Sequence, residues 1–181
     1  MAEKKIGATI ALNGEKEFRS AVTSCNKALS TMKSEMNLVK AQTSGQANTL
    51  ESLKKKHEVL NKTLEATKQK EQAVANGLSN AKDNYSKIGS ELTEYKTRLE
   101  AAKKTLEEMK VSGTATDEQL KEQEKTVSDL TNTVARTESS YQKAGDKVND
   151  WQKQLNNAQA QVISANSAVE ENAKYMKEAE T

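Results

Sequence analysis

Few residues of this chain have a type and spacing that could carry chemistry. His57 is the only histidine and Cys25 the only cysteine, so any metal site would need carboxylates beside one of them. The sequence contains no Glu-x-x-His or Cys-x-x-Cys spacing, no Gly-rich phosphate loop, and no nucleophile beside a base. We therefore expect no cofactor, no metal and no enzymatic activity.

The other conspicuous residues have structural interpretations. Cys25 belongs to an apolar stripe of a predicted helix, which favours a small buried hydrophobe over a reactive thiol. Trp151 falls on another such stripe, where core packing opposite Leu78 is expected rather than a partner contact. Glu71 interrupts a stripe and is expected to extend into solvent, with an oligomer contact as the alternative. Lysines 54–56 are expected on a solvated face.

Composition favours long helices. The 181 residues include no proline, 30% are charged and 3% are aromatic, which is typical of a coiled coil. Basic and acidic residues, 28 and 26 in number, are interleaved, so no nucleic-acid binding is evident. No apolar run approaches the roughly 20 residues of a membrane span. We expect a soluble chain without a membrane segment or a signal peptide.

Two heptad patterns dominate the sequence. Apolar residues recur at alternating spacings of three and four over residues 50–109 and again over residues 120–179, and each narrow seam must be covered by another helix. The patterns are separated by Ser112–Thr116, and Thr116 begins a capping box. A similar box begins at Asn48, after residues 43–47, which are expected to end the preceding helix. Helices are predicted at about 49–110 and 117–180.

The two seams fit either a continuous rod that oligomerises in parallel or an antiparallel hairpin. Turning the chain within residues 112–116 places Tyr85 opposite Ala144 and joins His57 with Asn172 in one polar layer, so that large residues repeatedly face small ones. We therefore favour an all-α fold with a long antiparallel helical hairpin, a coiled coil. The expected hairpin core consists of Leu50, Leu53, His57, Leu60, Leu64, Leu78, Tyr85, Leu92, Leu99, Leu106, Leu120, Val127, Leu130, Val134, Tyr141, Trp151, Leu155, Val169, Asn172 and Met176.

A strand and a helix are predicted before the hairpin. Alternation over residues 5–12 predicts a short β-strand that has no partner in the chain, and residues 15 to about 39 form an amphipathic helix. The expected domains are a cap at 1–43 and the hairpin at 44–181. Because a two-helix hairpin buries one seam, we expect either the cap helix to fold against it or several copies to associate. The candidate oligomer contacts are Ile6, Ile10, Leu12, Phe18, Val22 and Leu29.

The N-terminal sequence has a family likeness. Residues 4–18, Lys-Lys-Ile-Gly-Ala-Thr-Ile-Ala-Leu-Asn-Gly-Glu-Lys-Glu-Phe, resemble the N-terminus of tail tape measure proteins of long-tailed phages and prophages of Gram-positive bacteria. The segments 26–36, 47–53 and 112–120 continue the resemblance. Members of this family are usually much longer, so an N-terminal fragment or a truncated relative is expected.

The resemblance implies a virion structural protein of phage tail assembly. Several copies would occupy the tail tube, scaffold polymerisation of the tube protein and set tail length, with the tail tube protein and tail assembly chaperones as partners. The chain would then be located in the virion tail, and in the host cytoplasm during assembly. The alternative is a bacterial coiled-coil adaptor or a secreted helical-hairpin interaction protein.

Overall fold

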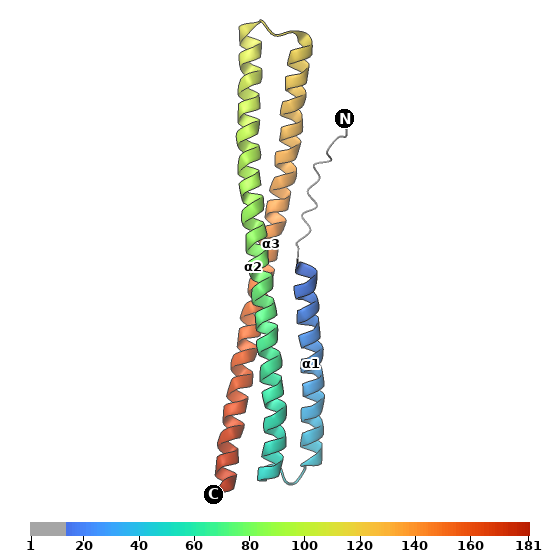
Figure 1. Ribbon diagram of the computed structural model, residues 1–181, viewed down its shortest axis with the longest axis vertical. Coiled ribbons are helices and arrows are strands. Elements are labelled where there is room, and N and C mark those ends of the chain that lie inside the picture. The colour runs from blue at the N-terminus through green and yellow to red at the C-terminus, as the bar shows by residue number, and fades with distance from the viewer. Residues whose placement is uncertain (1–13) are drawn as a thin grey trace. The chain divides into compact units, whose positions relative to one another are not determined.

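The computed structural model describes residues 14–181, which form three helices (Figure 1). Helix α1 spans Glu15–Gln42, α2 spans Leu50–Ser112 and α3 spans Asp117–Glu180. The predicted limits of the two long helices are correct to within two residues. No strand occurs within residues 14–181, and the strand predicted over residues 5–12 lies outside the described part.

Contacts divide the chain into two compact units. Within the described residues, unit 1 combines residues 14–80 with Asp150–Thr181, and unit 2 is Ala81–Asn149. Each long helix therefore contributes one segment to each unit, whereas α1 belongs to unit 1 alone. This division differs from the expected boundary between residues 43 and 44, because α1 packs with the segments of α2 and α3 that lie nearest to it.

Unit 2 is a two-helix hairpin. Gly113 follows α2 directly with φ of 62°, a left-handed conformation that glycine adopts without strain. The backbone N–H of Thr116 donates to Gln119 Oε1 at 2.9 Å, and the N–H of Gln119 donates to Thr116 Oγ1 at 3.3 Å. This reciprocal pair is the predicted capping box. The turn confirms the hairpin over the rod.

The core of unit 2 follows the two seams. Leu92 and Leu99 of α2 pack with Val134 of α3, and partly buried aromatic and aliphatic side chains surround them. On the flank, Lys96 and Glu138 form an ion pair at 2.8 Å between the two helices, and Lys110 and Glu124 form another at 3.0 Å. Both pairs are half exposed, so they contribute little stability but match the antiparallel register.

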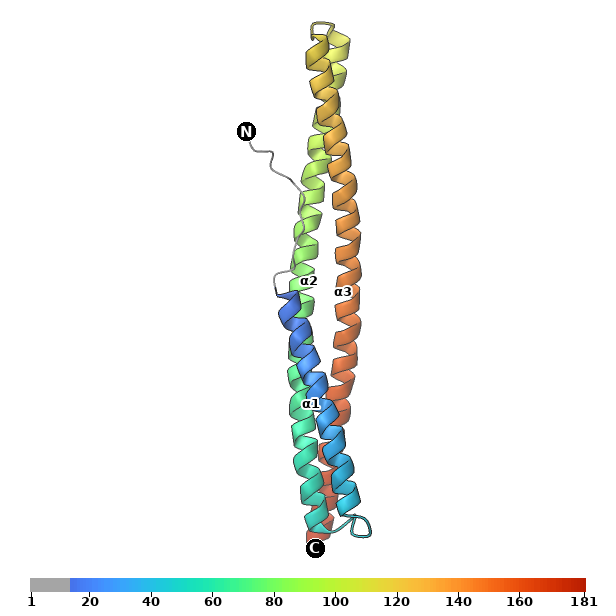
Figure 2. The same ribbon diagram turned by 90° about the vertical axis from the view of Figure 1, so that its right-hand side faces the viewer.

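Unit 1 contains three packed segments. Both ribbon views show α1 running beside the first half of α2, in the opposite direction (Figures 1 and 2). Lys62 Nζ of α2 lies 4.0 Å from Glu35 Oε2 of α1, and Asn172 of α3 donates a hydrogen bond to the Leu53 carbonyl of α2. Of the two expectations for the cap helix, folding against the hairpin is therefore observed.

Helix α2 begins one residue later than the Asn48 capping box predicts. The hydroxyl of Thr49 accepts a hydrogen bond from the Ser52 N–H at 3.3 Å, so Thr49 caps the helix.

Within residues 14–181, none of the helices combines the length and the apolar content that crossing a membrane requires.

Candidate interaction surface

Trp151 lies where the three segments of unit 1 meet. Its side chain is 1% exposed. One face of the indole rests on Gly77 of α2, where an added Cβ would lie 2.7 Å from two ring atoms. The Arg19 guanidinium of α1 lies 5.4 Å from the ring centroid, and Glu15 Oε1 holds that guanidinium at 2.7 Å. The first turn of α1 is thereby attached to the hairpin through a cation–π contact.

The glycine makes this arrangement possible. The predicted neighbour of Trp151 was Leu78, and the ring also rests on the residue before it, Gly77. Leu78 is itself buried at 5% exposure, so it still fills the seam. A large indole needs a facing gap, and the residue without a side chain supplies it.

A second stripe of buried residues on α2 was not predicted. Ser52, Val59, Ala66 and Ala73 recur every seven residues and are all buried, although none belongs to the seam that faces α3. We call these four residues the α1-facing stripe. The equivalent heptad positions in unit 2, which has no third helix, are occupied by Lys87, Glu94, Ala101 and Glu108, and all four are exposed.

The sequence contains a signal for this stripe. In residues 52–77 these heptad positions hold small or β-branched side chains, whereas in residues 87–108 three of the four are charged. Small residues let a third helix approach closely, and charged residues prevent it. Counting only the strongest apolar seam therefore missed the surface on which α1 lies.

A groove of about 410 Å³ opens at the end of unit 1 where α1 finishes. Its floor is apolar and includes Met36, Leu53 and Leu60, and its rim carries Lys40. Lys56, also on the rim, donates from Nζ to the Ala47 carbonyl at 2.9 Å and so ties α2 to the loop that follows α1. The groove thus contains contributions from all three helices.

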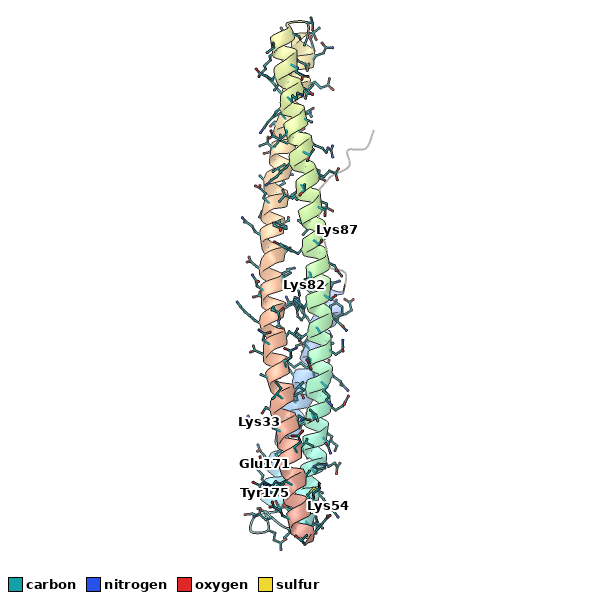
Figure 3. All side chains as sticks on the ribbon, turned by 90° about the vertical axis from the view of Figure 1, so that its left-hand side faces the viewer. Lys33, Lys54, Lys82, Lys87, Glu171 and Tyr175 are labelled. Carbon is teal, nitrogen blue, oxygen red and sulfur yellow. The ribbon has the colours of Figure 1, made fainter. Side chains whose placement is uncertain are left out.

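Tyr175 and Glu171 form the α3 side of this groove and lie close together there (Figure 3). The Tyr175 hydroxyl donates to Glu171 Oε1 at 3.2 Å. That hydrogen bond, with the charge of the same carboxylate, raises the pKa of Tyr175 above its ordinary value. Tyr175 therefore stays a neutral donor at this rim.

The polar layer differs from the predicted pair of His57 and Asn172. The Asn172 amide donates to the Leu53 carbonyl at 3.0 Å and approaches Met176 Sδ at 3.5 Å. The buried Nδ1 of His57 has no hydrogen-bond partner. The Leu53 carbonyl, one helical turn before His57, accepts the hydrogen bond of the Asn172 amide. Asn172 therefore has a hydrogen-bond partner without the imidazole of His57.

Two other seam residues have simple placements. The buried hydroxyl of Thr67 donates to the Leu64 carbonyl of its own helix at 2.8 Å, which removes the cost of a polar group at that position. Glu71 is half-buried. This fits a side chain whose stem lies along the seam while its carboxylate extends toward solvent. Cys25, on the apolar face of α1, is also half-buried.

Tyr85 of α2 and Tyr141 of α3 form a stacked aromatic pair in unit 2. Their rings stack with centroids 4.3 Å apart and planes 16° from parallel. Tyr85 was predicted opposite Ala144. Tyr85 lies beside Gly145, the residue after Ala144, where an added Cβ would be 3.4 Å from its ring. At Gly89 an added Cβ would be 3.1 Å from Tyr141, so each glycine leaves room for one ring.

Every residue of the predicted hairpin core is buried or half-buried. Of the candidate oligomer contacts, Phe18, Val22 and Leu29 are half-buried on α1, and Ile6, Ile10 and Leu12 lie outside the described residues. Within residues 14–181, no group of three or more His, Cys, Asp or Glu side chains is arranged to hold a metal ion.

Comparison with protein-family models, with curated proteins and with solved structures finds no match to this chain. The surface features of unit 1 are the α1-facing stripe and the groove at its end. They are helix faces and grooves between helices, of the kind through which helical proteins bind other helices.

Proposed function

We propose that this chain is a non-enzymatic structural protein of phage tail assembly and forms the N-terminal part of a tape measure protein. In this role several copies scaffold polymerisation of the tail tube protein and contribute to tail length. The tail tube protein and the tail assembly chaperones are its partners, in the virion tail and, during assembly, in the host cytoplasm. The resemblance of residues 4–18 to that family is the reason for choosing this function.

The observation that carries the proposal is the length of the two heptad-patterned helices. α2 has 63 residues and α3 has 64, and no proline interrupts either. A helix advances about 1.5 Å per residue, so its residue count translates directly into an axial distance. That property is what a scaffold of defined length requires.

The charge pattern supports protein partners. Basic and acidic side chains alternate along the helices and pair with one another, as Lys96 does with Glu138 and Lys55 with Glu51. The net charge is +2. A surface of mixed sign does not accumulate the field that attracts a polyanion such as DNA, but it can still be complementary to another protein.

The test is a length experiment in the phage or prophage that encodes this chain. Two heptads are duplicated in the unit 2 segment of α2, and the two register-matched heptads are duplicated in α3. Tails should lengthen by about 21 Å if the hairpin persists in the tail and by about 42 Å if the chain is extended there. Duplications in only one helix, which break the register, are the control.

Unchanged tail length, with the duplicated chain present in the particles, would contradict the length-setting role. Binding is tested separately, by co-expressing the chain with the tail tube subunit and chaperones encoded beside it. Secretion genes in place of tail genes would favour the bacterial helical-hairpin alternative.

A further inference from the structure

We infer that α1 is an exchangeable arm: the α1-facing stripe of one copy can be covered by α1 of a second copy, with residues 43–49 as the hinge. This inference rests on the self-association proposed above and names the surface that it uses. It follows from how α1 is held, how the stripe is buried and how the connection between them is built.

The stripe requires a covering helix. Ser52, Val59 and Ala66 are at most 8% exposed, and Trp151 beneath Arg19 is 1% exposed. If α1 moved away, these apolar and small side chains would face water along a shallow groove. Their heptad equivalents in unit 2 are exposed and mostly charged, so only the unit 1 segment of α2 is adapted to a third helix.

Helix α1 is held only shallowly in return. None of its residues is buried, and the apolar side chain of Leu38 is 57% exposed. Its N-terminus has no side-chain cap, because the N-cap residue is Gly14. Two of its contacts with the hairpin are the cation–π contact of Arg19 and the 4.0 Å ion pair of Glu35, both at partly exposed side chains. Removing α1 would therefore expose the stripe and also the half-buried apolar side chains of α1.

The connection has the features of a hinge. Residues 43–49 contain no proline, and Gly45 with φ of 83° is the only residue among them in a left-handed conformation. The N–H of Gln46 donates to the Thr43 carbonyl at 2.9 Å, and the N–H of Thr49 donates to the Gln46 carbonyl at 3.1 Å. Gly45 holds the first of these turns in a non-helical conformation, so the chain can straighten if the dihedral angles of Gly45 and its neighbours change to helical values.

Exchange conserves the contacts. An α1 supplied by a second copy would meet the same stripe, the same Trp151 ring and the same Lys62 as its own α1 does. The two states then differ only in the hinge and in the cost of bringing two copies together. A high local concentration, as in an assembly that holds several copies, shifts the balance toward exchange.

The test uses the single native cysteine. Cys25 lies between Arg19, which contacts the Trp151 ring above Gly77, and Glu35, which pairs with Lys62. In this antiparallel arrangement it is level with the turn of α2 that contains Lys70, whose Nζ donates to Gln161 Oε1 of α3 at 3.0 Å. The wild-type chain is mixed with a copy carrying Cys25→Ser and Lys70→Cys, and a short bifunctional maleimide is added. The informative product is the mixed link between Cys25 of the wild type and the cysteine that Lys70→Cys introduces in the variant, which is separated by mass from links between identical copies and forms when α1 of the wild type lies on the stripe of the variant.

Two controls make the result specific. Lys70→Cys with Cys25 retained must give a link within one chain, which verifies the proximity. Arg98→Cys with Cys25→Ser is the matched negative control, since position 98 is the same heptad position in unit 2 and is also basic. We expect the link between copies to exceed that control by about tenfold at high protein concentration.

A second variant removes the hinge. Deleting residues 43–49 removes one whole heptad and fuses α1 to α2, so α1 cannot fold back onto its own copy. The fused chain should sediment as a dimer with Trp151 still buried by its fluorescence, whereas a seven-residue Gly/Ser insertion after Gly45 should give a monomer.

Failure of the link between copies, with the proximity control positive, would overturn the exchange. So would a monomeric fused chain. If the wild type associates but Cys25 and Lys70→Cys are linked only within one chain, self-association runs through another surface. In that case the proposed function stands and this inference fails.

Discussion

The indole ring of Trp151 rests on the backbone of Gly77, with the Arg19 guanidinium on the ring from α1. The largest side chain of the protein is thereby matched to a residue that has none. This pairing fixes where α3 meets α2 in unit 1 and where the first turn of α1 docks. The stability of the unit should depend on the absence of a side chain at residue 77.

Gly77→Ala should destabilise the protein by about 1–3 kcal/mol, the usual cost of overpacking a core. The new Cβ would lie 2.7 Å from two atoms of an aromatic ring that has no free space to move into. In a helix interior alanine is otherwise favoured over glycine by about 1 kcal/mol, so the expected loss opposes the intrinsic preference. Urea unfolding followed by circular dichroism measures the change.

Gly145→Ala is the matched control. Its Cβ would lie 3.4 Å from the nearest atom of Tyr85, an ordinary contact, so this variant should be as stable as the wild type or slightly more stable. A stabilised Gly77→Ala protein would show that the indole does not pack on this glycine.

Removing the cap should change the environment of the single tryptophan. In a chain of residues 44–181, the ring loses the Arg19 contact and the shielding of α1, so Trp151 emission should shift to longer wavelength. Sedimentation of residues 1–181 and of residues 44–181 should show association of the longer chain only. Two monomers would count against the cap as the oligomerisation device.

The turn between α2 and α3 and the heptad seams are the parts of the fold that the sequence predicted best. Capping at Thr116 and Gln119 depends on neighbouring residues, and local chemistry of this kind is readable from the sequence. The heptad seams were readable for the same reason, since their spacing alone states which face each helix buries. The antiparallel pairing followed from volume matching between the seams.

The details that were not predicted depend on small residues. Gly89 and Gly145 leave the gaps that Tyr85 and Tyr141 occupy in their stack, and Gly77 leaves the gap that Trp151 occupies. A register argument that pairs residues by position alone cannot see these gaps. The α1-facing stripe was missed for a related reason, because weakly apolar residues such as serine and alanine carry little signal by themselves.

His57→Leu should stabilise the hairpin, by about 1 kcal/mol. The buried Nδ1 of His57 has no hydrogen-bond partner, so the folded state pays for its desolvation without compensation. Leucine suits this seam position and leaves no unpaired group. Asn172→Leu is the comparison, since it would also break the bond to the Leu53 carbonyl and should gain less. A His57→Leu variant with a lower unfolding midpoint would mean that the imidazole is satisfied in solution.

Thr116→Ala should lower the stability by about 1 kcal/mol. The substitution leaves the first-turn N–H of Gln119 without its side-chain acceptor. Thr114→Ala in the same turn is the control, because the Thr114 hydroxyl contacts only Ser112 Oγ and caps no helix. Thermal unfolding by circular dichroism should separate the two variants, and equal midpoints would contradict the role of the capping box.

Alkaline pH should weaken unit 2 through the tyrosine stack. The neighbouring Tyr141 hydroxyl raises the pKa of Tyr85 through side-chain hydrogen bonding, so the folded state holds this proton more tightly than the unfolded state does. The contribution is fully present below the ordinary tyrosine pKa of about 10 and is lost as pH rises through the higher folded value. Unfolding midpoints measured from pH 8 to pH 11 should therefore fall at the alkaline end.

Tyr85→Phe should flatten that fall. Because Glu171 also raises the pKa of Tyr175, the comparison is made in a Tyr175→Phe background, where Tyr85 is the remaining raised phenol. Tyr95→Phe in the same background is the matched control for loss of a hydroxyl from unit 2. Equal pH dependence in the two variants would show that the Tyr85 proton is not shared with Tyr141, and the stack would then act through ring packing alone.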